Sequence, residues 1–230
     1  MALTRIGPNQ SVNLASNVTG SLPVANGGIG ITSGTTDQFL KFTGTTTLAS
    51  AADNAGSLVL LSSGSTTSTT SSIAITGTQV TSTYDHYRLF LNGKAEADGK
   101  NIYMRYRNSS NDGLISSNYS FVAKDVGATN TQYSTTASTY IDITQLGAAG
   151  SGANEGFNLI LDFMSPLSNT VPTVAMYNFG AANTSDSWIY QIGAARRNDG
   201  TETHTGFTLY WNTGGDFDSY TYQFYGLAKS

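Results

Sequence analysis

The sequence has no cysteine and few charged residues. Without cysteine, the chain can form neither a disulfide nor a thiolate zinc site. Charged residues make up 11% of the chain, whereas a typical soluble protein has about 25%. The 11 Lys and Arg residues are scattered, so no basic stripe could neutralise a run of phosphates, and we expect no nucleic-acid partner.

Long apolar runs are also missing. No apolar run approaches the ~18 residues of a membrane-spanning helix, so we expect no membrane insertion. Residues 1–8 lack the apolar stretch of a signal peptide, so we expect no export signal. No amphipathic helix is evident either. The polar residues are instead mainly Ser, Thr, Asn and Gly, which predicts a polar surface with little charge.

What the chain does contain is aromatic area: 13 Tyr, 10 Phe and 2 Trp. Most of these residues follow position 55, and this predicts two regions. Residues 1–55 are rich in Gly, Thr, Ser and Ala, and Pro23 with the nearby glycines prevents a helix. That region has too little apolar mass for its own core, so we expect a flexible arm or an extended stem ordered by packing on copies of itself or on a partner. Residues 56–230 are expected to form the folded domain.

A succession of short alternating segments predicts that residues 56–230 are all-β. The expected strands include residues 87–91, 102–107, 119–123, 139–143, 157–163, 173–179, 188–192, 207–211 and 220–227. Polar, Gly- or Asn-rich connections separate nearly all of them, and Asn92-Gly93 is a typical hairpin-turn signal. Residues 62–72 suggest a loop between the first two strands, or alternatively a linker. The predicted fold is an extended N-terminal arm or stem followed by a jelly-roll-like antiparallel β-sandwich.

Catalytic constellations are not evident in the sequence. His86 and His204 are the only imidazoles, and neither lies in a metal-binding or nucleophile motif. We expect both to be ordinary surface or half-buried histidines. The carboxylate pairs Asp216/Asp218 and Asp186/Glu202 could serve a glycosidase, but pairs of loop carboxylates are commonplace. We therefore predict a protein that is not an enzyme and has no cofactor or metal.

Aromatic side chains can mark carbohydrate sites, because a sugar's apolar face stacks on an aromatic ring. Two alternating sets have the pattern of core residues, namely Phe207, Leu209, Trp211 and Trp188, Tyr190, Ile192. Better glycan-binding candidates are expected in two loops, residues 128–138 and the segment just before Trp188. These candidates are Tyr133, Asn183, Ser185 and Asp186.

Two segments resemble bacteriophage virion proteins. Residues 18–30, VTGSLPVANGGIG, resemble the VTGTLPVANGGTG stretch of tail-fibre and related proteins, and residues 1–6 look like the start of such proteins. The short motifs TYDHYRL at 83–89, NYS at 118–120 and FYGLAK at 224–229 resemble a β-sandwich module of phage structural proteins, which often ends in LYGIK. Release of a virus particle by lysis would also reconcile an exterior-type composition with the missing export signal.

The resemblance implies an appendage on the exterior of the phage particle, usually a homotrimer, whose N-terminal part docks on other virion proteins of the tail, baseplate or capsid. No catalytic residues come with it. We expect a tail fibre whose sandwich recognises a host-surface polysaccharide; the alternative is a capsid decoration or head-fibre protein that binds the capsid through its N-terminal arm. The candidate particle-docking residues are Leu3, Ile6, Val12, Leu14, Val18 and Leu22.

Overall fold

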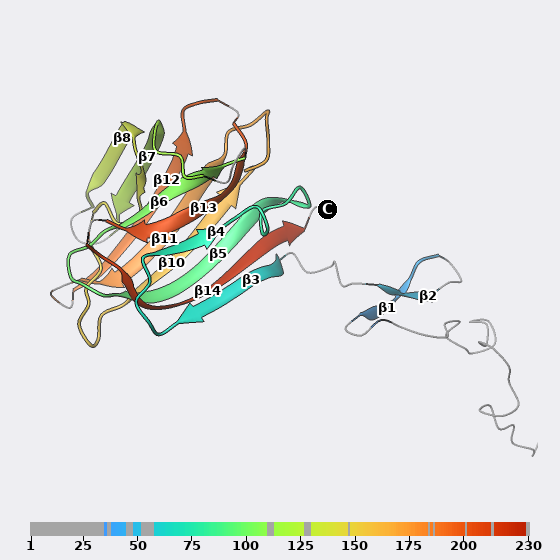
Figure 1. Cartoon of the computed structure of the whole chain (residues 1–230), viewed down its shortest axis with the longest axis horizontal. Coiled ribbons are helices and arrows are strands. Elements are labelled where there is room, and N and C mark those ends of the chain that lie inside the picture. Colours follow the sequence, from blue (N-terminus) through green and yellow to red (C-terminus); the bar gives the residue numbers. More distant parts are fainter. Residues whose placement is uncertain are drawn as a thin grey trace, which may run out of the picture. The chain divides into compact units, whose positions relative to one another are not determined.

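The computed structural model describes residues 35, 38–44, 48–51, 58–109, 113–126, 130–146, 148–183, 185, 187–200, 202–212 and 214–228. The chain divides into two units, Met1–Gly56 and Ser57–Ser230. Each named strand belongs to an antiparallel sheet, and none of the described residues is helical (Figure 1). The predicted all-β class is confirmed.

In the first unit, the described residues form a small hairpin. Strand β1 (Phe39–Phe42) pairs antiparallel with β2 (Leu48–Ala51), and the Ser50 hydroxyl donates a hydrogen bond to Gln38 Oε1 at 2.7 Å. The side chains of Phe39 and Phe42 are exposed. An isolated two-stranded hairpin of this kind is at best marginally stable in water.

The second unit is a sandwich of two sheets. In spatial order the larger sheet contains β3 (Leu58–Thr66), β14 (Phe217–Ala228), β5 (Tyr84–Ala95), β10 (Phe157–Met164), β11 (Val174–Ala182), β12 (Trp188–Arg197), β7 (Tyr119–Asp125) and β8 (Gln132–Ser138). The smaller sheet contains β4 (Ser72–Ile75), β13 (His204–Trp211), β6 (Ile102–Asn108) and β9 (Ile141–Asp142). Figure 1 shows the smaller sheet lying across the larger one.

The strand order contains a complete jelly roll. The order β3-β14-β5-β10 faces the order β4-β13-β6-β9, and the chain crosses between the sheets from β3 to β4, β5 to β6, β9 to β10 and β13 to β14. Two further pairs, β7 with β8 and β11 with β12, extend the larger sheet by four strands. The predicted jelly-roll-like sandwich is therefore confirmed, and the extension enlarges one outer face.

Alternation along the strands builds the core between the sheets. On β10, Phe157, Leu159, Leu161 and Phe163 are buried, as their spacing predicts. The ring of Phe207 from the opposite sheet meets Phe163 edge-on, with 5.1 Å between the ring centroids. Each large apolar side chain buried in this way stabilises the fold by about 1.5–3 kcal/mol.

Three local predictions need correction. Asn92-Gly93 is not a turn but lies inside β5, where the missing side chain of Gly93 leaves room for the ring of Phe157. Residues 62–66 belong to β3 and pair with β14, so the predicted loop between the first two strands is confined to residues 67–71, and the linker alternative is wrong. Residues 139–143 contain only the short β9, whereas the strand β8 comes before them. In each case pairing across the sheet overrides the local turn or composition signal.

Candidate functional site

The most exposed tryptophan lies on the outer face of the larger sheet. Trp188, Tyr190 and Ile192 point outward from β12, and Trp188 is 68% exposed, so the prediction that this set belongs to the core is wrong. The inner positions of β12 carry the buried Gln191 and Ala195 instead. The matching set on β13, which contains Trp211, is buried as predicted.

The reversed orientation of β12 has a steric cause on the neighbouring strand. Tyr177 of β11 fills the space inside the sandwich opposite Gly193, where an added Cβ would lie 2.1 Å from the Tyr177 ring. The side-chain oxygen of Gln191 accepts a hydrogen bond from the backbone N–H of Leu146 at 3.1 Å, which satisfies this buried amide oxygen. On the inner side of β12 only Ile189 is a large apolar residue packed against the core, whereas Trp188, Tyr190 and Ile192 face outward.

A groove of about 570 Å³ borders Trp188, and we call it the Trp188 groove. Amide, hydroxyl and aromatic side chains dominate its lining, together with one lysine and one glutamate. These side chains belong to Thr66, Thr67, Asn92, Lys94, Asn154, Glu155, Phe157, Asn158, Trp188, Ser219, Tyr220 and Thr221. The residues come from five strands, β3, β5, β10, β12 and β14, with Thr67 after β3 and the turn before β10, so the register of the sheet assembles the groove.

The groove lies at one end of the sandwich. In the register of the larger sheet, Leu58 pairs with Leu227, and Leu227 pairs with His86, at the end where the chain enters β3. Tyr220 pairs with Gly93 at the opposite end, and Gly93 pairs with Phe157. The Trp188 groove is therefore at the end of the sandwich farthest from the chain's entry.

The chemistry of the groove suits a neutral polar ligand with apolar patches. Amide and hydroxyl groups can both donate and accept hydrogen bonds, and the indole ring offers an apolar surface. The indole lies against Gly180, which leaves its outer side open to solvent. Glu155 is buried and accepts a hydrogen bond from the backbone N–H of Gly152, so its carboxylate stabilises the turn.

Two of the predicted glycan-binding residues lie next to Trp188 in the chain. The side-chain oxygen of Asn183 accepts hydrogen bonds from the backbone N–H groups of Ser185 and Ser187, both at 3.0 Å. Asn183 therefore shapes the turn that leads into Trp188, and Ser185 is exposed on that turn. Asp186 lies outside the described residues. Sequence reasoning missed Trp188 itself and the groove amides Asn92 and Asn158.

Tyr133 is in a different place from the one predicted. It belongs to β8 and not to a loop, and its half-buried ring packs beside Phe121, with 5.6 Å between the ring centroids. Phe121 faces the core, so Tyr133 lies on the inner face while Trp188 lies on the outer face. The structure does not bring the two aromatic side chains together. The predicted particle-docking residues Leu3, Ile6, Val12, Leu14, Val18 and Leu22 lie outside the described residues.

The structure describes three of the four carboxylates considered for catalysis, namely Glu202, Asp216 and Asp218. Glu202 forms an ion pair with Arg197, which also pairs with Asp199. Asp216 and Asp218 lie at the start of β14, and Asp216 accepts the backbone N–H of Glu96 through its carbonyl oxygen. No group of three or more His, Asp or Glu residues that could hold a metal ion occurs in the described parts of the chain. A helix that could span a membrane is likewise absent from those parts.

His204 is buried at the start of β13, contrary to the expected surface or half-buried position. Its Nδ1 lies 2.8 Å from the hydroxyl oxygen of Thr173, and its ring packs edge-on against Tyr106. Burial, together with the smaller effect of the positive charge of Arg197, lowers the pKa of His204 to about 4. The imidazole is therefore neutral in the folded protein at neutral pH.

Acidification is expected to destabilise the sandwich through His204. In the unfolded chain a histidine has a pKa of about 6.5. As the pH falls from 6.5 toward 4, the unfolded chain takes up a proton that the folded chain does not. The free energy of unfolding then falls by about 1.4 kcal/mol per pH unit, and the full contribution is present only above pH 6.5.

Thermal unfolding between pH 7 and pH 5 measures this slope. His204→Asn keeps a polar group near Thr173 but cannot titrate, so its melting temperature should depend less on pH than that of the wild type. The exposed His86 provides the matched control, because His86→Asn should retain the wild-type slope. If the melting temperatures of the wild type and His204→Asn depended equally on pH, the pH dependence would not come from His204.

No protein-family model, curated protein or solved structure matches this chain.

Proposed function

We propose that this chain is a non-enzymatic structural protein of a bacteriophage virion, a homotrimeric tail fibre on the exterior of the particle. Its N-terminal part docks on the virion, and its β-sandwich binds a glycan of the host surface. The observation that carries the glycan-binding role is the exposed indole of Trp188 at the edge of an amide- and hydroxyl-lined groove.

The groove combines the two kinds of contact that bind a sugar. Solvent-exposed tryptophan rings lose apolar surface to water when a pyranose stacks on them, at about 25 cal/mol for each Å² covered. Asn92, Asn158 and Thr221 provide donors and acceptors from three neighbouring strands of the same face. Because these polar groups lie on paired strands, they are held in place before the ligand arrives, which lowers the entropy cost of binding.

The arrangement of the sandwich supports presentation of the groove to a host. The chain enters at Leu58, and the groove lies at the opposite end of the strands. A domain anchored through its N-terminal side would then present its ligand site away from the anchor. The small share of charged residues also favours neutral polymers over charged ones.

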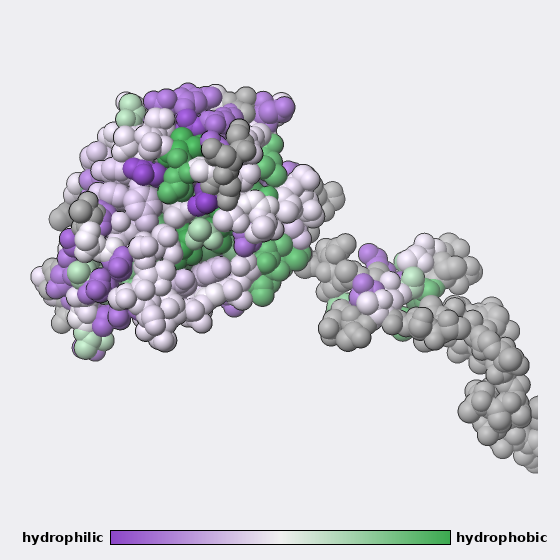
Figure 2. All heavy atoms as spheres, in the orientation of Figure 1, coloured by the Kyte–Doolittle hydropathy of each residue, from purple (hydrophilic) through white to green (hydrophobic). Residues whose placement is uncertain are grey.

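The visible surface of the sandwich has the same character. In Figure 2 pale, weakly polar residues cover much of the face shown, and both strongly hydrophilic and hydrophobic residues appear in patches among them. A surface of this kind forms many weak hydrogen bonds and few strong ion pairs. It suits a fibre that binds uncharged saccharides repeatedly along a cell surface.

Binding of the full chain to host glycans tests the proposal. Purified protein is titrated with oligosaccharides released from susceptible host cells, while tryptophan fluorescence is recorded. Trp188 is exposed and Trp211 is buried, so ligand-dependent changes in emission are expected to come from Trp188. If the protein bound no glycan from susceptible hosts in fluorescence and in cell-binding assays, the proposed glycan-binding role would be wrong.

A further inference from the structure

The outer face of the larger sheet is divided into two zones along its strands. The zone at the Trp188 end carries the groove amides Asn92 and Asn158. Moving toward the other end, the outward residues become apolar and form a contiguous band across the sheet. We define the apolar band as Leu60, Phe90, Ile160, Met176, Ile192 and Val122.

Strand register makes the band continuous. Phe90 of β5 pairs directly with Ile160 of β10. Between β10 and β11 the apolar contact is diagonal, because Ile160 pairs with Asn178 and Met176 lies two residues away from Asn178 on β11. Met176 pairs with Ala194 of β12, and Ala194 pairs with Val122 of β7. At the other edge Leu60 pairs with Tyr225, whose ring meets Phe90 edge-on at 5.9 Å between centroids.

The band is exposed in the described chain. Its aliphatic members are between 37% and 52% exposed. An antiparallel sheet that packs one face on the core normally places polar residues on the other face. Single exposed apolar residues are ordinary, but a contiguous patch marks an interaction surface.

Two basic residues, Lys124 and Arg196, face outward beside the β12–β7 part of the band, whereas the charges at its centre are paired. Arg88 and Asp162 face outward there and pair with each other in a two-pronged contact, with N–O distances of 2.6 and 2.8 Å. This pairing raises the pKa of Arg88, mainly through the hydrogen bonds to Asp162. A partner for this surface therefore needs no charge of a particular sign at its centre.

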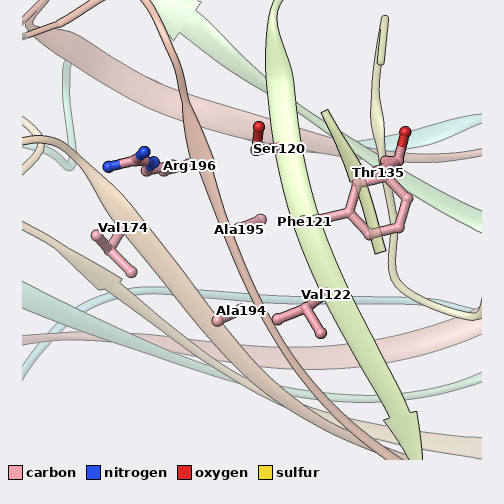
Figure 3. Close-up of a pocket in the computed structure, with 8 residues that line it drawn as sticks. All are labelled: Ser120, Phe121, Val122, Thr135, Val174, Ala194, Ala195 and Arg196. Atoms are coloured by element: carbon pink, nitrogen blue, oxygen red, sulfur yellow. The ribbon is translucent and has the colours of Figure 1, made fainter. Parts of the chain in front are cut away.

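Two shallow hollows lie on the surface of the band. Their volumes are about 300 and 370 Å³, and they share Val122 and Ala194. Figure 3 shows Val122 and Ala194 side by side on neighbouring strands, with Val174 on the strand beyond. The small side chain of Ala194 lies among larger neighbours, so the surface can receive apolar side chains of a partner.

We infer that the apolar band is the contact surface for other copies of this chain, with the larger sheets of the three copies facing one another around the axis of the trimer. Two sheets commonly pack face to face at about 10 Å, with interdigitating apolar side chains. The band exposes apolar surface on the order of several hundred Å², a large part of the ~800 Å² that each partner contributes to a typical stable interface.

Self-association also suits the rest of the chain. The β1–β2 hairpin exposes the rings of Phe39 and Phe42, and copies of the chain can cover them. The band and the Trp188 groove share no residue, so packing of the band leaves the groove open. The inference rests on the homo-oligomer within the proposed function but not on glycan binding, and several grooves in one assembly would raise avidity for a repetitive glycan.

Methionine oxidation of the full-length protein tests the inference directly. Light scattering first gives the mass, which should exceed that of one chain. Dilute peroxide then converts accessible methionines to sulfoxides, and mass spectrometry follows Met176 with the fully buried Met104 as the internal standard. In the assembled wild type, Met176 should react as slowly as Met104. Ile192→Lys should place a charge in the band and speed Met176 oxidation by about tenfold or more.

The matched control is Val171→Lys, at a similarly exposed apolar position outside the band, which should leave Met176 protected. Circular dichroism confirms that each variant is folded, and Val122→Lys replaces Ile192→Lys if the latter is not. A mass of one chain would overturn the inference together with the homotrimer. An oligomer whose Met176 reacts freely in the wild type, or stays protected in Ile192→Lys, would overturn the inference alone. Glycan binding is measured separately, so its failure is distinguishable from either result.

Discussion

Replacement of Trp188 by alanine is expected to weaken glycan binding about 30- to 100-fold, which corresponds to about 2–3 kcal/mol. The indole provides the largest exposed apolar surface beside the groove, and it is positioned against Gly180 by the strand pairing of β11 with β12. Alanine removes the stacking surface but leaves the groove amides in place. Titration calorimetry with the oligosaccharide that binds the wild type measures the change.

Two variants control this experiment. Trp188→Phe keeps an aromatic ring and should retain most of the affinity. Val171→Ala changes an exposed apolar residue near the opposite end of the sandwich and should bind like the wild type. Because Trp188 is mostly exposed, none of these changes should lower the melting temperature appreciably. Unchanged affinity in Trp188→Ala would show that the groove is not the glycan site.

Replacement of Gly206 by alanine is expected to destabilise the sandwich by about 3 kcal/mol or more, and so to lower the melting temperature by about 10 °C. Gly206 lies on β13, at the register shift in its pairing with β6. A Cβ atom there would lie 2.0 Å from the carbonyl oxygen of Ile75. That oxygen belongs to the backbone of the paired strand β4, so the strand itself would have to move.

Gly77→Ala is the matched control. A Cβ at Gly77 would lie 3.5 Å from Thr205, which is an ordinary contact. This substitution should change stability by less than about 1 kcal/mol, and it can stabilise the protein slightly by restricting the unfolded chain. Thermal unfolding by circular dichroism compares the variants. Similar melting temperatures for Gly206→Ala and the wild type would show that β4 and β13 can separate without loss of stability.

The features of the fold that depend on local alternation could be predicted from the sequence. Phe157, Leu159, Leu161 and Phe163 share one face because successive side chains of a strand point to opposite sides. The same rule identified Phe207, Leu209 and Trp211 as a set, and their burial followed. Repetition of such segments with polar connections was enough to predict the all-β sandwich.

Which face of a strand is buried could not be predicted in the same way. Alternation places Trp188 with Tyr190 and Ile192, but the bulk of Tyr177 opposite Gly193 is what turns this set outward. Tyr177 is on another strand, and only the pairing of β11 with β12 brings the two residues together. The candidate groove was missed for this reason, although Asn183 and Ser185 of the turn that precedes Trp188 in the chain were identified.

The sequence by itself therefore determined the all-β class, the change in composition near residue 55, and the members of each alternating set, because these depend on composition and on the two-residue period of a strand. Tertiary structure alone decided that β7, β8, β11 and β12 extend one sheet, that Asn92-Gly93 continues a strand, and that His204 is buried. It also decided that the groove and the apolar band lie on one outer face. These features depend on which strands pair and at what register, and long-range packing between distant segments determines both.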